Sequence, residues 1–491
     1  MNISEHRSSE GIRHSTVGII GGGVAGATIA LRLAELGISI NLFEEGISLV
    51  NGPPICHLHA GGNLYREISN QQCLNLLEQS IDTLRVFKHT ANIRPTVIAV
   101  PIDDKGSALD LIPRLDLLKT TYEQLVKRDN KNKVLGEPSD YFTLYSKQDI
   151  EKLRQLDNPT HPITPNDWMI PVAKSLQLDQ FKYPIVIVQE YGLSVFRIAA
   201  TASLALNQME NCQVLLSSKV CEVEYDQVTQ RWVITYRTQD NHKQQCTVDF
   251  LINACGYRSG TIDDLAHTPR ERMVEFKAAY VTRWKECKGH WPEVIIHGER
   301  GTPKGMAQLT PYPNGYFQLH GMTKDITLFE NGLVTSDHSS AQPKLNDAFK
   351  EKLNRQWSEG EVIERTEKAI KHVAQYVNTF KSAVIGGKPL FGAQQIPGAD
   401  ATLRAADISF SGDNYARSEI VKASSALSAA DAIVSELITK GIITSPNNDN
   451  VNTREQLFST TLQLDKQDIL AKAEKIAVQR GFPASLAQPI G

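Results

Sequence analysis

Six residues near the start of the chain have the types and spacing to hold a dinucleotide. The run from Gly21 to Gly26 reads Gly-Gly-Gly-Val-Ala-Gly and fits the pattern G-x-G-x-x-G. In this pattern the first glycine allows a tight turn, the second lets the backbone approach a pyrophosphate, and the third lets a helix pack on a strand. Glu44 follows Gly26 by 18 residues, close to the spacing of the acid that binds a ribose and disfavours a 2′-phosphate. The pattern therefore indicates a dinucleotide site, against the alternative of a structural glycine turn without a ligand.

The elements that must position these residues are a strand, a helix and a second strand. Thr16–Ile20 is a short, largely β-branched run that predicts a buried strand, and Ile38–Phe43 predicts the next one. Val24–Leu36 predicts a helix between them, with small residues at several positions. A pyrophosphate would lie at the positive end of that helix. The sequence thus predicts a β-α-β unit of the usual size.

The segments Val17–Gly26 and Leu42–Gly46 together resemble the FAD-binding N-terminus of the glutathione-reductase-like flavoproteins. Within these, the chain looks closest to the group of D-amino-acid oxidase, glycine oxidase and the sarcosine and dimethylglycine dehydrogenases, which includes the malate:quinone-type dehydrogenases. The matching motifs are spread over residues 15 to 438. The resemblance implies FAD as the cofactor. It also implies cofactor contacts from the glycine-rich turn and from two acids after the second strand, namely Gly21, Gly22, Gly23, Val24, Ala25, Gly26, Glu44 and Glu45.

A loop rich in glycine resembles the segment that lies against the flavin ring in this family. It contains His59, Ala60 and Gly61. In the dimethylglycine and sarcosine dehydrogenases a histidine in a similar setting carries the flavin covalently, so His59 is a candidate for covalent attachment. The alternative, which we favour, is that His59 only hydrogen-bonds the loop or the flavin.

Two β segments resemble further cofactor contacts. Lys219–Val223, followed by a second strand, resembles the family's β-meander, in which the backbone at Val220 would reach the adenine. An ordinary hairpin is the alternative. Phe250–Ser259 resembles a family strand whose following glycine, here Gly256, lets the backbone approach the FAD diphosphate.

A Gly-Asp pair late in the chain resembles the motif that related flavoproteins place before their last FAD-facing helix. The pair is Gly412 and Asp413, and the helix is expected at Ser424–Leu437. By this resemblance Asp413 would bind a ribitol hydroxyl, which suits a carboxylate because it accepts two such bonds. The alternative is a plain turn or N-cap aspartate.

Three residues are candidates for handling the substrate. Leu309–Gly321 resembles the family hairpin that leads a strand towards the flavin, so His320 would lie near the ring and could bind or deprotonate an amine or hydroxyl. A sheet histidine with satisfied hydrogen bonds is the alternative. Arg404 and Arg417 lie in segments expected near the flavin, where either could hold a carboxylate as a bidentate partner; surface arginines are the alternative. The family's Gly-x-Arg-Pro segment is replaced by Gly392–Gln395, so that arginine is absent here.

Composition excludes several other classes of protein. The chain has 491 residues and a net charge of -3, which excludes a nucleic-acid binder that relies on bulk positive charge. Seven dispersed cysteines without a Cys-x-x-Cys pair predict reduced thiols, no disulfide framework and no metal site. No apolar run reaches membrane-spanning length, and residues 1–14 lack the apolar core of a secretory signal. We therefore expect a cytoplasmic protein, with peripheral contact to a membrane left open.

We expect an α/β fold with a Rossmann-type FAD-binding domain, made of a parallel sheet plus a β-meander, and a mixed-sheet α+β substrate domain. The expected ranges are 14–70, 190–270 and 385–440 for the FAD-binding domain, 71–189 and 271–384 for the substrate domain with a helical insert, and 441–491 for a C-terminal linker and helix.

The function that the resemblance implies is FAD-dependent oxidation of a small amine, amino acid or 2-hydroxy acid. A hydride would pass to flavin N5, and the electrons would then pass to oxygen or to a quinone-type acceptor. One alternative is an NAD(P)H-dependent flavin monooxygenase. Another is a flavoprotein that acts on a partner protein, with residues 109–156 and 465–480 as docking surfaces. A homo-oligomer is also left open, and no nucleic acid is expected as a partner.

Overall fold

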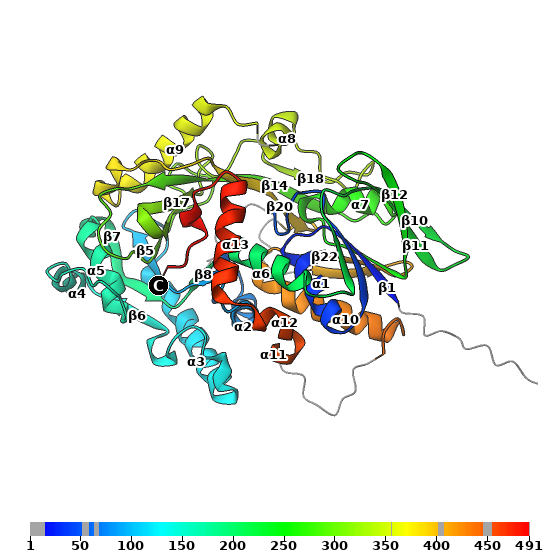
Figure 1. Ribbon diagram of the computed structural model, residues 1–491. Coiled ribbons are helices and arrows are strands. Elements are labelled where there is room, and N and C mark those ends of the chain that lie inside the picture. Colours follow the sequence, from blue (N-terminus) through cyan, green and yellow to red (C-terminus); the bar gives the residue numbers. More distant parts are fainter. Residues whose placement is uncertain are drawn as a thin grey trace, which may run out of the picture.

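A six-stranded sheet forms the centre of one half of the molecule (Figure 1). The computed structural model describes residues 15–51, 58–62, 68–354, 356–400, 407–444 and 454–490, and the statements that follow concern these residues. The strand order is β21-β22-β13-β1-β2-β9. The strands are β1 (Thr16–Ile20), β2 (Ser39–Phe43), β9 (Cys212–Leu215), β13 (Phe250–Asn253), β21 (Asp407–Ser411) and β22 (Tyr415–Glu419).

Five of these strands are parallel, and only the edge strand β21 runs the other way. Their C-terminal ends therefore meet at one edge of the sheet, here called the carboxyl edge, which is formed by Ile20, Phe43, Asn253 and Glu419. Ligands of open α/β sheets bind at such an edge. The opposite end, where the same strands begin, is called the amino edge.

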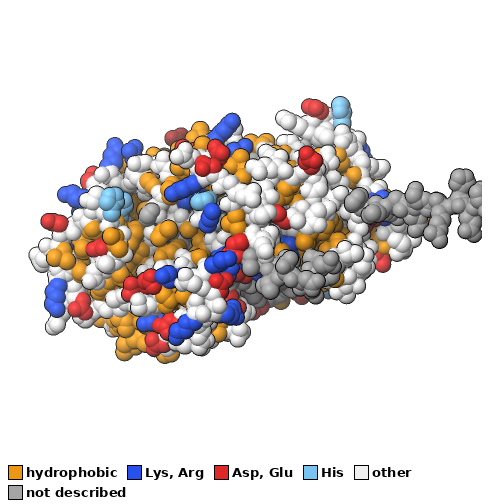
Figure 2. Space-filling model, turned by 60° about the horizontal axis from the view of Figure 1, so that its bottom comes forward, with side chains coloured by type: hydrophobic (Ala, Val, Ile, Leu, Met, Phe, Trp, Pro, Cys, Tyr) orange, Lys and Arg blue, Asp and Glu red, His pale blue; other side chains and the backbone are white. Residues whose placement is uncertain are grey.

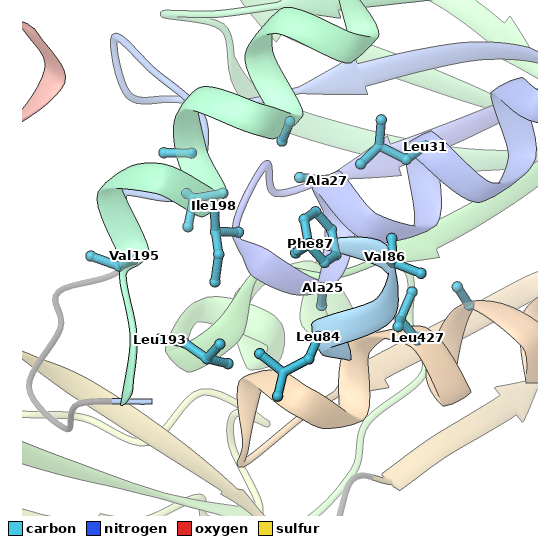
Figure 3. Close-up of a cluster of buried hydrophobic side chains, with 14 of the residues drawn as sticks. Ala25, Ala27, Leu31, Leu84, Val86, Phe87, Leu193, Val195, Ile198 and Leu427 are labelled. Atoms are coloured by element: carbon cyan, nitrogen blue, oxygen red, sulfur yellow. The ribbon is translucent and has the colours of Figure 1, made fainter. Parts of the chain in front are cut away.

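Helices cover one face of this sheet. They are α1 (Val24–Glu35), α2 (Asn70–Val86), α6 (Val195–Leu206), α10 (Ala426–Thr439) and α13 (Lys466–Gln479). Small side chains such as Ala25 and Ala27 on α1 let its neighbours approach closely, and they pack against Leu84 of α2, Ile198 of α6 and Leu427 of α10 in a single apolar cluster (Figure 3). Close packing of this kind gives the helices a fixed position over the sheet.

The other face is covered by a β-meander and a short helix. These elements are β10 (Lys219–Asp226), β11 (Arg231–Arg237), β12 (Lys243–Val248) and α7 (Ser259–Leu265). Trp232 and Ile234 of the meander pack with Phe43 and Leu251 of the sheet. The half therefore has three layers, as expected for a Rossmann-type domain with a meander.

A ten-stranded mixed sheet dominates the other half of the molecule. Its strands are β5 (Thr96–Pro101), β6 (Phe142–Tyr145), β7 (Phe181–Val188), β14 (Arg272–Arg283), β15 (Glu293–Ile296), β16 (Ala307–Tyr312), β17 (Tyr316–Gly321), β18 (Leu333–Thr335), β19 (Val384–Ile385) and β20 (Leu390–Pro397). Helices α3 (Ile112–Arg128), α4 (Lys147–Leu153), α5 (Pro165–Ser175), α8 (Asp347–Leu353) and α9 (Glu359–Ala374) belong to this part of the chain.

The two faces of this sheet differ in chemistry. One face carries apolar side chains such as Leu309, Phe317 and Leu319, which pack with residues of α5 and α9. The alternate positions of the same strands are polar and yet buried. These positions are here called the polar face, and they are Glu275, Lys277, Glu293, Gln308, Thr310, Gln318 and His320. Apolar residues on the same side, Ala279 and Val281, belong to the core cluster of the six-stranded half, so the polar face is turned towards that half.

Two smaller units join the halves. β3 (Leu58–Ala60), β4 (Ala91–Asn92) and β8 (Tyr191–Leu193) form a three-stranded antiparallel sheet in the order β3-β8-β4. The C-terminal segment contains α11 (Arg454–Leu457) and α12 (Ser459–Gln463) before α13. α13 lies along α6, and the chain then returns towards the turn between β16 and β17 (Figure 1).

The expected fold class is confirmed, and the structure differs from the sequence expectations in two places. The range 109–156, expected to be mostly helical, contains the edge strand β6, which pairs with β7. β20 lies in a range expected to belong to the FAD-binding domain, but it pairs along eight residues with β14 of the ten-stranded sheet. Both strands depend on partners far along the chain, which local patterns do not reveal.

Candidate cofactor and substrate site

The glycine-rich turn lies at the carboxyl edge, between β1 and α1. Gly21 has a φ of 99°, and a Cβ there would lie 2.5 Å from the carbonyl oxygen of Ala254. A Cβ on Gly26 would lie 1.8 Å from the carbonyl oxygen of Gly21. These two glycines are therefore required by packing alone.

Gly23 is different, because its surroundings are open. A Cβ on Gly23 would meet nothing within 4 Å, and its φ of -65° is ordinary for any residue. Gly23 is the N-cap of α1, no side chain of the described residues caps this end, and Val24 follows it half-buried. Free N–H groups at the positive end of a helix form a site for an anion, and the missing side chain lets that anion come close.

Glu44 follows β2 at the same edge and is held in place by its neighbours. Its Oε2 accepts a hydrogen bond from the amide of Gly22 at 2.8 Å, and its Oε1 accepts from the amide of Gly46 at 2.7 Å and from Asn51 Nδ2 at 3.3 Å. Burial raises the pKa of this carboxyl group, while these hydrogen bonds oppose the rise. Each carboxylate oxygen has two lone pairs, so Oε2 retains one for a hydroxyl of a ligand.

Glu45 has a partner that the sequence did not suggest. Its carboxylate pairs with Arg258 at 2.5 Å, and Arg258 also lies over the ring of Tyr257. Arg258 comes two residues after Gly256, which lies three residues beyond the end of β13, has a φ of 56° and has open space where a Cβ would be. The carboxyl ends of β2 and β13 are thus joined beside the glycine-rich turn.

Val220 and Cys255 complete this edge. β10 starts next to Glu44, whose carbonyl oxygen accepts a hydrogen bond from the amide of Ser218 at 2.9 Å, so Val220 lies two residues beyond this contact with the carboxyl edge. The Sγ of Cys255 donates to the carbonyl oxygen of Ile20 at 3.1 Å, and burial raises the pKa of this thiol well above its usual value. Cys255 is therefore a packing residue and not a nucleophile.

Gly412 and Asp413 are not brought to this edge. They form the exposed turn between β21 and β22, at the amino edge. The neighbouring Asn414 donates from Nδ2 to the carbonyl oxygen of Asp249, which immediately precedes β13. A strand rises about 3.3 Å per residue, so Asp413 lies roughly 20 Å from the carboxyl end of β22. The geometry does not support its predicted contact with a ribitol chain, and its carboxylate accepts a hydrogen bond from Gln227 Nε2 at 3.4 Å instead.

The predicted flavin loop is described only in part. β3 pairs its backbone with β8, with His59 opposite Gly192 and Ala60 opposite Tyr191, but the side chains of residues 58–60 lie outside the described set. Gly61 has a φ of 149°, and a Cβ there would lie 2.5 Å from Cγ of the buried Glu190. β3 contacts the short helix at 423–425 that precedes α10, so the loop lies at the carboxyl edge.

Of the two arginines predicted to bind substrate, the structure places only Arg417, and its side chain is engaged elsewhere. Arg404 lies outside the described residues. Arg417 is buried in β22, and its Nε pairs with Asp263 of α7 at 2.7 Å. Asp263 also accepts from Arg272 and from the hydroxyl of Tyr415 at 2.7 Å. Arg417 therefore points to the meander side of the sheet and belongs to a buried structural network.

His320 lies on the polar face, with 3% of its surface exposed. Neither ring nitrogen has a hydrogen-bond partner among the described residues, which is unusual for a buried imidazole. Burial, reinforced by the positive charges of Lys277 and Arg300, lowers its pKa to about 3. The ring is therefore neutral at pH 7 and too weak a base to take a proton from an ammonium or hydroxyl group. It can still donate one hydrogen bond and accept another.

Charged groups that the sequence analysis missed surround His320. Lys277 pairs with Glu275 at 2.7 Å and donates to Gln394 Oε1 at 2.9 Å, and Arg300 also pairs with Glu275. The available signal was the alternation of charged and apolar residues along β14, which indicates a strand with one polar face. On the other side Gln308, opposite His320 in the register, donates to Glu293.

Arg94 adds a buried cation to the same side of the sheet. Its Nη1 donates to Glu293 Oε2 at 2.6 Å, and both side chains are fully buried. Within the part of the chain that the structure describes, the Nε and Nη2 atoms of Arg94 have no hydrogen-bond partner. Buried donors without partners are rare in native proteins and call for an explanation, such as a ligand or ordered water.

The polar face and the carboxyl edge meet at β20. Gln394, which binds Lys277, also donates from Nε2 to the carbonyl oxygen of Val421 at 3.5 Å. Val421 lies between the carboxyl end of β22 and α10. The segment that follows is fixed from the other side, because Thr83 Oγ1 donates to the carbonyl oxygen of Ser424 at 3.2 Å. A ligand bound at the carboxyl edge would therefore extend towards His320 and Lys277.

The described residues contain no candidate metal centre outside this site. No group of three or more potential metal ligands occurs among the described residues, and none of their helices combines the length and apolar character needed to cross a bilayer. On the face shown in Figure 2, basic and acidic side chains are interspersed, and neither sign forms a continuous patch.

Comparison with solved structures identifies this arrangement. Glycine oxidase from Geobacillus kaustophilus superposes with a TM-score of 0.55 and 12% identity, over 87% of this chain and 95% of that one. L-α-glycerophosphate oxidase from Mycoplasma pneumoniae, solved with FAD bound, gives a TM-score of 0.56 and 14% identity, over 89% and 97%. The chain has the fold of the D-amino-acid-oxidase-like flavoproteins.

A third similar structure extends the range of chemistry found on this fold. L-amino acid deaminase from Proteus vulgaris matches with a TM-score of 0.55 and 12% identity, over 94% of this chain and 99% of that chain. No protein-family model matches the sequence, and no curated protein sequence matches it. The predicted resemblance is thus confirmed at the level of the fold, and similarity of sequence does not extend it to a particular substrate.

Proposed function

We propose that the protein is an FAD-dependent oxidoreductase, an oxidase or a dehydrogenase, that oxidises a small amine, amino acid or 2-hydroxy acid. The observation that carries the proposal is the open space at Gly23, where an uncapped helix N-terminus, a glycine and a buried acid converge at the carboxyl edge. The fold supports it, because the similar structures include enzymes solved with FAD.

The residues present fit this cofactor. The backbone of residues 21–26 would hold the pyrophosphate against α1, and the free lone pair on Glu44 Oε2 would accept a ribose hydroxyl. Val220 would lie on the adenine side, Gly256 would allow close approach of the diphosphate region, and the strand containing His59 would lie against the ring.

When bound, the flavin would accept a hydride from the substrate, and the protein would mainly orient the two partners. The neutral ring of His320 would hold a polar group of the substrate by donating or accepting a hydrogen bond. Lys277 would favour a substrate with an anionic group, since its cluster with Arg300 and Glu275 carries one net positive charge. Because the polar face is buried, the reaction would take place away from bulk water, where these interactions are stronger.

The first test is the visible spectrum of the purified protein, recorded natively and after acid precipitation. We expect flavin bands in the native protein, and we expect the colour to move into the supernatant on precipitation because FAD is held without a covalent bond. Colour that stays in the precipitate would assign His59 as the attachment site. A colourless protein that cannot be reconstituted with FAD would overturn the proposal.

The glycine-rich turn at residues 21–26 and Glu44 are together called the cradle. A pair of glycine variants tests whether the cradle binds FAD. In Gly23→Glu a carboxylate enters the open space at the N-terminus of α1, where it would compete with a pyrophosphate, and we expect FAD binding to be lost while the fold is kept. Gly360→Glu is a matched control, because Gly360 is exposed near the start of α9 and also has open space around a Cβ. If Gly23→Glu binds FAD as tightly as Gly360→Glu, the cradle is assigned wrongly.

A substrate panel separates the reaction classes. Reduction of the bound flavin by an amino acid, amine or hydroxy acid without NAD(P)H would support the proposed class. Flavin reduction that requires NADPH would instead indicate a monooxygenase. Reoxidation by oxygen or by a soluble quinone analogue would then identify the electron acceptor.

A further inference from the structure

The C-terminal helix is tied directly to the loop that supports the glycine-rich turn. Arg480, the residue that ends α13, is 5% exposed. Its Nη1 donates to the carbonyl oxygen of Val50 at 2.9 Å, and its Nη2 donates to the carbonyl oxygen of Leu49 at 2.7 Å and to Ser48 Oγ at 3.0 Å. One guanidinium group from the last helix thus binds three consecutive residues of a loop more than 400 positions earlier in the chain.

The loop that Arg480 holds is strained. Val50 has a φ of 54°, which is a rare conformation for a β-branched residue, and it is fully buried. Such a conformation persists only where the surroundings fix it from several sides, and it is frequent at functional sites. Here the amide of Val50 donates to the carbonyl oxygen of Gly22 at 2.8 Å, and its carbonyl oxygen accepts from Arg480.

The same loop positions the other parts of the cradle. The side chain of Leu49 packs beneath Gly22, where a Cβ would lie 2.7 Å from Leu49 Cδ2. Ser48 Oγ donates to Asn51 Oδ1 at 2.8 Å, and Asn51 Nδ2 donates to Glu44 Oε1 at 3.3 Å. Val50 and Leu49 are therefore one contact away from Gly22, and Ser48 is two contacts away from Glu44, through Asn51.

Residues 480–485 of the C-terminal segment also contact the half of the molecule that contains the ten-stranded sheet. Lys388, which follows β19, donates to the carbonyl oxygen of Arg480 and lies over the ring of Phe482 at 4.4 Å. Asn314, in the turn between β16 and β17, donates to Ser485 Oγ at 3.0 Å. The segment spans from the cradle to the sheet that carries His320.

We propose that Arg480 is a positioning residue of the cofactor site, and that docking of α13 and binding of a dinucleotide in the cradle stabilise each other. The inference rests on the proposed FAD function. Without Arg480 the strained loop relaxes, Gly22 and Glu44 lose their support, and the cradle becomes less favourable for the ligand. Linkage requires the reciprocal effect, so the bound ligand holds the loop and thereby α13.

The experiment compares three variants of the full-length protein. Arg480→Met keeps the apolar length of the side chain and removes the donors, and Arg480→Lys keeps the charge without the planar fork. Arg154→Met is the matched control, because Arg154 binds the carbonyl oxygens of Ala173 and Leu176 at 2.8 Å each, at the end of α5 and away from the cradle. The affinity of each apoprotein for FAD is measured by quenching of flavin fluorescence.

We expect Arg480→Met to weaken FAD binding about tenfold or more, because a hydrogen bond from a charged donor contributes about a factor of ten to an equilibrium constant. The affinity of Arg480→Lys for FAD should lie between those of Arg480→Met and the wild type. Arg154→Met should bind FAD as tightly as the wild type. Hydrogen exchange of the wild type provides a second readout that needs no variant. Amides of residues 466–479 should exchange several-fold more slowly with FAD than without it.

The outcomes separate this inference from the proposed function. If the wild type binds no FAD, the proposed function fails and the coupling fails with it. If the wild type binds FAD, but Arg480→Met has unchanged affinity or FAD leaves the exchange of α13 unchanged, the coupling alone is overturned. A weaker affinity in Arg154→Met of the same size would show general loosening and would also overturn it.

Discussion

Replacement of His320 by glutamine should make the stability of the protein less sensitive to acid. The wild-type imidazole is buried beside Lys277 and Arg300, and its pKa is lowered to about 3. In the unfolded chain its pKa returns to about 6.5, so between these values the unfolded state binds a proton that the folded state does not. Stability therefore falls as the pH drops below about 6.5, and this loss ends near pH 3.

The size of the effect follows from the two pKa values. Between pH 7 and pH 5, this one residue should cost the wild type about 2 kcal/mol of unfolding free energy. Glutamine is neutral throughout this range and still offers a donor and an acceptor, so His320→Gln should lack this part of the slope. The other titrating groups are shared by both proteins and cancel in the comparison.

The assay is urea unfolding of both proteins at pH 7.0 and pH 5.0, followed by tryptophan fluorescence, with the same state of flavin loading in each sample. The quantity of interest is the difference between the two pH-dependent losses, and not the absolute stability of the variant. Equal losses in the two proteins would show that His320 takes up a proton readily in the folded state. The polar face would then be open to water, and the proposed role of a neutral imidazole would be refuted.

Two further predictions concern the edges of the six-stranded sheet and the buried network around Asp263 of α7. Glu44→Gln should weaken FAD binding about tenfold, because it removes the charge from an acceptor of a ribose hydroxyl. Asp413→Asn should leave the affinity for FAD unchanged, because Asp413 lies at the amino edge. A fluorescence titration of both variants measures these affinities, and a weaker affinity in Asp413→Asn would contradict the placement of the site. Asp263→Asn should destabilise the protein by about 3–5 kcal/mol, because it leaves two buried guanidinium groups without their shared carboxylate. Denaturant unfolding measures this effect, with the exposed Asp240→Asn as control, and a loss below about 1 kcal/mol would mean that the network is not buried in solution.

In the half that contains the six-stranded sheet, the sequence predicted the elements well where the pattern lies within one short stretch of chain. The turn at residues 21–26 and its flanking strands lie within one short stretch, and the glycine requirements there follow from direct contacts such as that between Gly26 and Gly21. Glu44 could be placed because it ends the adjacent strand. Such local patterns are reliable because the residues that form the turn also make the contacts that require glycine there, so local and tertiary preferences agree.

The failed and missing assignments have a different physical origin. The Gly-Asp pair at 412–413 carries no information about which end of a strand it occupies, and only the pairing of β22 with β13 places it at the amino edge. Arg94 and Glu293 are 199 positions apart, so their pairing could not be anticipated from spacing. The unpartnered imidazole of His320 is likewise a property of the packed sheet and not of its own segment.

The central position of β1 has a consequence for how the protein is made. β1 leaves the ribosome early, but its neighbour β13 begins at residue 250 and β22 at residue 415, and Arg480 follows still later. At a synthesis rate of about 5–20 residues per second, β1 and its neighbour β2 wait roughly ten seconds or more for β13, which pairs with the other side of β1. During this time that side of β1 is an unpaired strand edge, which can pair with another chain. The six-stranded sheet is therefore completed only late in synthesis, when β22 has been made.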